Sequence, residues 1–253
     1  MGARQYLEQV SQLLESLRTQ DTIIRAVAQQ AAITIEEGRW VRLFGSGHSV
    51  LPIQDCFPRY GGFVGFDPMM DPRLMWTVVS GPGGAEELLW LERQEGYMEV
   101  FLRHVTWQTG DMLVIVSHGG QNAAPVEVAL AAKQRGLYVV AVTSIDNHRH
   151  RCATHSSGKK IGDVADVIVD TGVPSDDALV TVPGVPGKVA GASTLMAIAV
   201  IQAIVAETAV QLTQRGYRVI PFASPNSVDV ESDRSARVYE AYRQRLAETL
   251  ARG

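Results

Sequence analysis

The sequence predicts an α/β protein, a three-layer sandwich around a doubly wound, five-stranded parallel sheet with a helical extension at its N-terminus. Short apolar runs alternate with longer segments of helical periodicity along the 253 residues. The run Met112–Val116 is apolar at every position, which is typical of a strand buried on both faces. Hydrophobic residues make up 46% of the chain, enough to cover both faces of such a sheet.

The elements can be placed in order along the chain. Residues 4–36 carry apolar side chains at helical spacing and predict one or two helices. The predicted strands are residues 40–44, 63–66, 112–116, 137–142, 164–169 and 178–182. The later predicted helices are residues 85–104, with a break at Gly96, and residues 125–135, 189–215 and 231–251. We therefore expect an N-terminal helical extension (1–36), the α/β domain (37–220) and a C-terminal helix that packs on it (221–253).

Composition and charge exclude several classes of protein. The net charge of −4 gives no basic footprint for nucleic acid. Cys56 and Cys152 are far apart in the sequence and form no disulfide framework or metal-ligand cluster, which favours two reduced thiols in a cytoplasmic protein. Residues 1–20 lack the pattern of a signal peptide, and polar residues interrupt the apolar stretch 189–210, which favours a core helix over a membrane span. We expect a cytoplasmic protein with neither nucleic acid nor membrane as a partner.

Two glycine-rich loops follow predicted strands: GSGHS at residues 45–49 and SHGGQN at residues 117–122. In each, glycines allow a tight turn that presents backbone N–H groups, polar side chains add donors, and a helix follows, a combination that can bind an anion. Neither loop has the Gly-Lys-Ser/Thr of a Walker loop or the third glycine of the dinucleotide fingerprint. Ligands of open α/β sheets bind where the strand order reverses, so we expect both loops to face one crevice.

The segment from Gly45 to Val210 resembles the SIS (sugar isomerase) domain, the family that includes the phosphoheptose isomerases. The resemblance is strongest in the GSGHS loop, at residues 95–101, in the second βαβ unit over residues 110–143, and in the motifs at residues 155–159 and 191–194. It implies a flavodoxin-like fold that binds a sugar phosphate and either interconverts aldose and ketose phosphates or opens a sugar-phosphate ether.

The resemblance also implies which residues bind the phosphate. The second loop departs from the Ser-x-Ser-Gly pattern usual in the family, because Gly119 stands where a serine is expected. Helix N-capping is the structural alternative at Ser193 and Thr194, where a cap and an anion site share one geometry. The expected phosphate-binding residues are Gly45, Ser46, Gly47, His48, Ser49, Ser117, His118, Gly119, Gly120, Asn122, Ser193 and Thr194.

Both reactions need a base that removes a proton next to a carbonyl and an acid that serves the oxygen. We expect Glu95 or Asp55 to be the base, His155 to be the acid, and Lys159 to neutralise the phosphate or an enediolate. Each has a structural alternative, such as a favourable place near a helix end for Asp55. Phosphoheptose isomerases use a C-terminal histidine as the acid, and no histidine follows His155 here.

Three functions remain open: an aldose–ketose phosphosugar isomerase, a non-catalytic phosphosugar sensor, and a sugar-phosphate ether lyase or hydrolase. Only about 35 residues precede the first strand, too few for the helix-turn-helix domain of SIS transcription regulators. By resemblance we expect a homodimer or homotetramer with its sites near the interface. We expect no cofactor and no metal, because His148, His150 and His155 lack the spacing of a zinc site.

Overall fold

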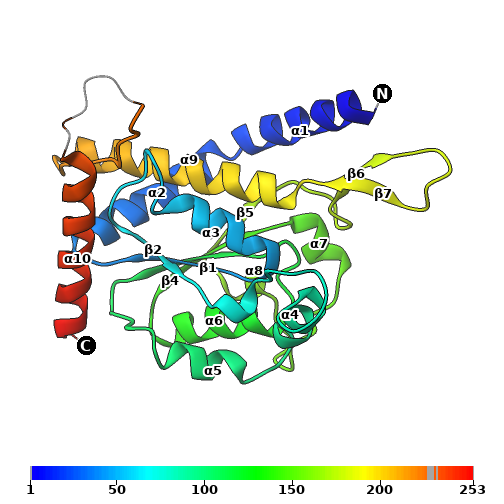
Figure 1. Ribbon diagram of the computed structural model, residues 1–253, viewed down its shortest axis with the longest axis horizontal. Coiled ribbons are helices and arrows are strands. Elements are labelled where there is room, and N and C mark those ends of the chain that lie inside the picture. Colours follow the sequence, from blue (N-terminus) through cyan, green and yellow to red (C-terminus); the bar gives the residue numbers. More distant parts are fainter. Residues whose placement is uncertain (1, 227–230, 232, 253) are drawn as a thin grey trace.

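The sheet has the predicted five-stranded parallel architecture (Figure 1). The computed structural model describes residues 2–226, 231 and 233–252. The strand order is β2-β1-β3-β4-β5, and each neighbouring pair is parallel. The strands are β1 (Val41–Gly45), β2 (Phe66–Met69), β3 (Met112–Val116), β4 (Tyr138–Thr143) and β5 (Val167–Asp170). This confirms a doubly wound α/β sandwich.

Helices cover both faces of the sheet because alternate residues of each central strand are buried in opposite layers. Val114 and Val116 point into one core and Leu113 and Ile115 into the other. One layer contains α1 (Gly2–Arg18), α2 (Asp21–Glu36), α3 (Val50–Cys56) and α9 (Ser193–Gln214). The other contains α4 (Ala85–Leu91), α5 (Tyr97–Leu102), α6 (Ala123–Gln134) and α8 (Ile161–Val164).

The strand order reverses between β1 and β3. From β1 the chain continues to β2 on one side, then crosses back to β3 on the other side of β1. The loops that leave the carboxyl ends of β1 and β3 therefore flank the topological switch point, where ligands of open α/β sheets bind. These are the two glycine-rich loops singled out in the sequence.

Two predicted strands lie elsewhere than expected. The second strand is not residues 63–66 but β2, whose Phe66 pairs with Val41 and whose Met69 pairs with Phe44. Phe63 is buried against Phe66 before the chain joins the sheet, so its apolar character reflects core packing rather than strand pairing. Residues 178–182 were expected in the main sheet, but β6 (Ala178–Thr181) forms a separate antiparallel hairpin with β7 (Lys188–Gly191).

Helix boundaries also differ from the prediction. The segment expected as one helix from residue 189 is β7 followed by α9, which begins at Ser193. The predicted break at Gly96 is confirmed, because Gly96 has φ of 85° and separates α4 from α5. The polar loop after β4 contains the short helix α7 (Ile145–His150), whose first turn is capped by the hydroxyl of Ser144.

Helix α9 is the element that resembles a membrane span. By length and composition it is apolar enough to cross a membrane, but its buried face packs against α2 and α3, as a core helix does.

Helix α10 (Arg234–Arg252) packs at the β2 side of the molecule, where Tyr242 donates a hydrogen bond to Asp67 and Thr249 accepts one from Trp40 (Figure 1). The 3-10 turns are η1 (Gly47–Ser49) and η2 (Pro72–Leu74).

Candidate functional site

The first loop turns sharply from β1 into η1 and α3. A side chain at Gly45 would place its Cβ 2.2 Å from the carbonyl oxygen of Ser49, so glycine alone fits there. Gly47 has φ of 62°, a left-handed conformation that glycine adopts without strain. The exposed imidazole of His48 meets the ring of Trp76 edge-on, with the centroids 4.5 Å apart. Gly47 and His48 help to line a cavity of about 260 Å³.

The second loop is held together by hydrogen bonds of its own. The hydroxyl oxygen of Ser117 accepts a hydrogen bond from the backbone N–H of Gly120. Gly120 has φ of 60°, and a Cβ there would lie 2.7 Å from a side-chain carbon of Ile161. Gly119 is not constrained in this way, because the nearest atom to its Cβ position is 3.6 Å away. The loop therefore ends in a fixed position at Asn122, directly before α6.

A buried carboxylate joins the two loops. Glu92, at the end of α4, accepts hydrogen bonds from Ser46 Oγ (2.8 Å) and from Asn122 Nδ2 (2.7 Å), one to each carboxylate oxygen. The residue is only 7% exposed. Burial raises the pKa of Glu92 above its usual range, and the hydrogen bonds from Ser46 and Asn122 offset only part of that effect. A carboxylate with a raised pKa at a switch point is suited to proton transfer.

Sequence reasoning missed Glu92 and chose Glu95, three residues later. One signal was available in the sequence. Glu92 follows Leu88 by four residues, so a carboxylate stands on the apolar face of a predicted helix. Leu88 is buried, and Glu92 is buried on the same face.

A small crevice brings together four of the predicted phosphate-binding residues. Ser49 of the first loop, His118 of the second loop, and Ser193 and Thr194 at the start of α9 all line it. Its walls include Val116 and Val142, at the carboxyl ends of β3 and β4. Hydroxyl groups, an imidazole and the N-terminus of a 22-residue helix converge here, and this is the chemistry of an oxyanion site.

Asp177 occupies part of the helix terminus beside this crevice, although it does not line the crevice itself. Its carboxylate accepts hydrogen bonds from the backbone N–H groups of Ala192 and Ser193 and from Ser193 Oγ. Burial opposes ionisation of Asp177, but these hydrogen bonds outweigh it and hold its pKa below the usual range. A phosphate would therefore contact the helix start through Thr194 and would lie near this negative charge.

The other predicted catalytic residues lie apart from this crevice. Asp55 accepts hydrogen bonds from Arg59 and from Gln202 of α9, which ties α3 to α9. Lys159 is exposed and lines neither the crevice nor the outer pocket described next. The neighbouring Lys160 is buried instead, and its ammonium donates to the backbone carbonyls of His148 and Arg151.

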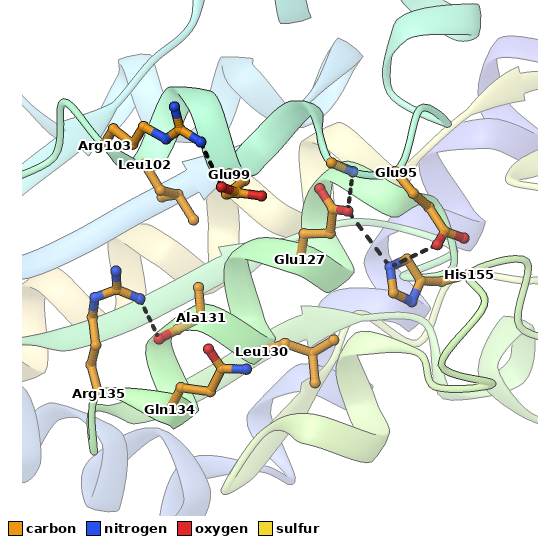
Figure 2. A pocket seen from close by; sticks show the side chains of 11 residues that line it. Glu95, Glu99, Leu102, Arg103, Glu127, Leu130, Ala131, Gln134, Arg135 and His155 are labelled. Carbon is orange, nitrogen blue, oxygen red and sulfur yellow. Dashed lines mark hydrogen bonds and ion pairs between the residues drawn. The ribbon is translucent and has the colours of Figure 1, made fainter.

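Glu95 and His155 do come together, in a pocket of about 740 Å³ between α5 and α6 (Figure 2). His155 Nε2 lies 3.7 Å from Glu95 and 3.8 Å from Glu127, while its Nδ1 accepts the backbone N–H of Ser157. Hydrogen bonds from the hydroxyl and backbone N–H of Ser156 hold the pKa of Glu95 below its usual range. This outer pocket shares no lining residue with the crevice.

The three histidines of the polar segment after β4 face different carboxylates. His148 faces Asp163, His150 faces Asp146, and His155 faces two glutamates. Across residues 2–226, 231 and 233–252, no group of three His, Cys, Asp or Glu side chains is arranged to hold a metal ion.

The sequence matches a protein family model and is similar to chains from bacteria. A model of the SIS domain matches residues 5–144. The chain is 33% identical over 246 residues to a UPF0309 protein of Streptomyces coelicolor, covering 96% of each. It is 30% identical over 243 residues to a UPF0309 protein of Oceanobacillus iheyensis, covering 94% of this chain and 97% of the other.

Among solved structures, a phosphoheptose isomerase from Neisseria gonorrhoeae has a similar fold. The TM-score is 0.52 at 15% sequence identity, and the likeness covers 82% of this chain and 98% of the other. At this identity the likeness concerns the arrangement of the sheet and its helices, not the residues of the site.

Proposed function

Because the chain belongs to the SIS domain family, we propose that it binds a sugar phosphate and interconverts the aldose and ketose forms of that compound. The SIS domain supports a sugar-phosphate-related function. The single observation that carries the isomerase proposal is the buried Glu92 carboxylate, which bridges the two loops at the switch point.

The crevice at the start of α9 is the proposed phosphate site. Ser49 and Thr194 offer hydroxyl donors, and His118 offers a ring nitrogen. The positive end of the α9 dipole adds to their attraction for an anion. The protein as a whole carries a net charge of −4, so these local groups must supply the binding energy.

Glu92 is the proposed base. In the aldose it removes the proton from C2, the electrons of that C–H bond form the C1–C2 double bond, and the electrons of the C1 carbonyl move onto O1, which takes a proton from the acid to give an enediol. The protonated Glu92 then returns its proton to C1, while O2 gives its hydroxyl proton back to the conjugate base of the acid and becomes the C2 carbonyl oxygen. A raised pKa suits both halves of this transfer, because the group must release the proton as readily as it takes it.

His155, the acid proposed from the sequence, lies in the outer pocket rather than in the crevice, and it stays a candidate acid. Its Nδ1 lies within hydrogen-bond distance of the backbone N–H and the hydroxyl of Ser157, and its Nε2 faces Glu95 and Glu127. Thr154 beside it donates to the backbone carbonyl of Gln121, which places this segment against the second loop. Asp55, Glu95 and Lys159 stay candidates that the same experiment compares.

We also propose that the protein is cytoplasmic and acts as a homodimer or homotetramer. Apolar side chains of α1, α3 and α9 stay exposed in the single chain, among them Leu7 at 62% and Leu51 at 46%. Burying them against a second copy would remove this apolar surface from water.

Deuterium incorporation tests the proposal. The protein is incubated in D₂O with aldose and ketose phosphates, and exchange of the C2 proton is followed by NMR. Glu92→Gln should abolish exchange while sugar-phosphate binding persists. The matched control is Glu240→Gln, since Glu240 is exposed on α10, away from both pockets, and pairs with Arg243.

The outcomes separate the candidate functions. Loss of exchange in Glu95→Gln alone would assign the base to Glu95 and refute the role of Glu92. Binding without any exchange in the wild-type protein would indicate a sensor, and release of lactate from a lactyl ether would indicate an ether hydrolase.

A further inference from the structure

Two side-chain amides converge on Gly119 in the second loop. A Cβ at Gly119 would lie 3.6 Å from Asn147 Oδ1 and 3.7 Å from the Cγ and Cδ atoms of Gln121. Asn147 belongs to α7 and Gln121 to the second loop, so two separate segments approach the position that a side chain of residue 119 would occupy. Because residue 119 is glycine, a space the size of a methyl group stays unfilled there.

The amide oxygens that border this space have no donor. Asn147 Oδ1 and Gln121 Oε1 are buried without a hydrogen-bond partner in the part of the chain that the structure describes. Asn147 is only 6% exposed, and its orientation is fixed because its Nδ2 donates to the backbone carbonyl of Ser175. Rotating the amide by 180° would set two oxygens against each other. Buried acceptors are normally satisfied, so this pair calls for a donor from outside the chain.

The position of the pair relates it to the proposed site. His118 lines the crevice, and Asn122 binds Glu92. Residues 118 to 122 therefore run from the proposed phosphate site to the proposed base, and Gly119 and Gln121 lie between them.

We propose that Asn147 and Gln121 form an acceptor pair that binds a hydroxyl group of the sugar, between its phosphate and its reacting carbon. This inference rests on the proposed function. A hydroxyl group donates one hydrogen bond and can satisfy an acceptor of the pair, whereas a deoxy carbon leaves both unsatisfied. The pair thereby selects sugar phosphates by the presence and stereochemistry of that hydroxyl.

Calorimetric titration with matched ligands tests the inference. The probes are inorganic phosphate, glucose 6-phosphate, and its 2-deoxy, 3-deoxy and 4-deoxy analogues. For the wild-type protein, the 3-deoxy or the 4-deoxy analogue should bind about fivefold more weakly than glucose 6-phosphate, the loss expected for one neutral hydrogen bond, and a loss confined to the 2-deoxy analogue would contradict the inference. Gln121→Met, which keeps the length of the side chain without an acceptor, should reduce this preference to less than twofold.

Two further variants complete the design. Gly119→Ala fills the space with a methyl group and should also remove the preference. Gly119 is not in the left-handed region, so its backbone accepts the change. Gln134→Met is the matched control, because Gln134 is exposed on α6 in the outer pocket and should keep the full preference.

The outcomes distinguish this inference from the proposed function. If inorganic phosphate and glucose 6-phosphate both fail to bind the wild-type protein, the phosphosugar proposal fails and the inference falls with it. If they bind but the wild-type protein shows no preference for glucose 6-phosphate over the deoxy analogues, or if Gln121→Met keeps that preference, the acceptor pair does not bind a sugar hydroxyl. Loss of stability in Gln121→Met with an unchanged preference would show instead that Gln121 donates to Asn147 within the protein.

Discussion

Replacing Glu92 by glutamine should abolish the exchange activity while leaving the stability of the protein nearly unchanged. The pKa of Glu92 is raised in the folded protein, so the folded state holds this proton more tightly than the unfolded state does. The stability of the protein is therefore highest below the unfolded pKa of about 4.3, and it falls as pH rises from there through the folded pKa. Ionised Glu92 therefore stabilises the fold less than protonated Glu92 does.

The size of the effect follows from that linkage. Each unit by which the pKa is raised corresponds to about 1.4 kcal/mol of lost stability at neutral pH. Glutamine has no such cost, and its amide can keep both contacts, with Oε1 accepting from Asn122 Nδ2 and Nε2 donating to the Ser46 hydroxyl. Glu92→Gln should therefore be at least as stable as the wild type at pH 7.5, and the two should differ by less than about 1 kcal/mol at pH 4.

Urea unfolding at the two pH values measures this difference, and exchange kinetics measure the activity. Loss of a general base lowers a rate by roughly 10²- to 10⁴-fold, and we expect a decrease of that size in Glu92→Gln. A variant that is destabilised by more than about 2 kcal/mol at both pH values would show a structural carboxylate and refute the reasoning.

Four other substitutions test three separate parts of the account. Gly45→Ala should destabilise the protein by about 2–4 kcal/mol in urea unfolding, because its Cβ would meet the Ser49 carbonyl oxygen, whereas Gly119→Ala should cost less than about 1 kcal/mol; equal effects would contradict the described loop. Asp177→Asn keeps a residue type that tolerates the left-handed backbone at this position (φ 64°), and it should cost about 1 kcal/mol at pH 7. Since the pKa of Asp177 is lowered, the stabilisation by its carboxylate is present above the unfolded pKa and fades as pH falls through the folded pKa. Calorimetry should show that Asp177→Asn binds inorganic phosphate more tightly than the wild type, because the negative charge is gone. Weaker binding would place the phosphate elsewhere. Leu7→Asp, at an exposed position of α1, should convert an oligomer into monomers in light scattering while circular dichroism stays unchanged, and an unaltered mass would exclude α1 from the interface.

The central strands could be predicted because burial on both faces leaves an unmistakable apolar run. Val114 and Ile115 face opposite cores, and both must be apolar. The position of β2 could not be predicted in the same way, because Phe63 and Phe66 are equally buried and only pairing with β1 distinguishes them. The β6–β7 hairpin likewise required knowledge of which strands pair.

The site was predictable where local chemistry defines it and not where tertiary contacts do. The glycine-rich loops carry their own signal, and Ser49, His118 and Thr194 line one crevice because parallel strands end at one edge of the sheet. The spacing of Glu92 from Leu88 marks it as a buried carboxylate, but its contacts with both loops depend on the tertiary structure. Asp177 reaches the start of α9 from the hairpin, which no local pattern shows.

Thermal unfolding with phosphorylated and unphosphorylated sugars tests the central claim, that the crevice binds a sugar phosphate. A ligand at about 100 times its dissociation constant adds roughly 2.7 kcal/mol of stability, or a shift of about 5–10 °C in Tm for a chain of this size. We expect phosphorylated sugars to raise Tm in the wild-type protein and to lose most of that effect in Thr194→Val. Equal shifts with free sugars, or shifts that survive Thr194→Val, would contradict binding of the phosphate in this crevice.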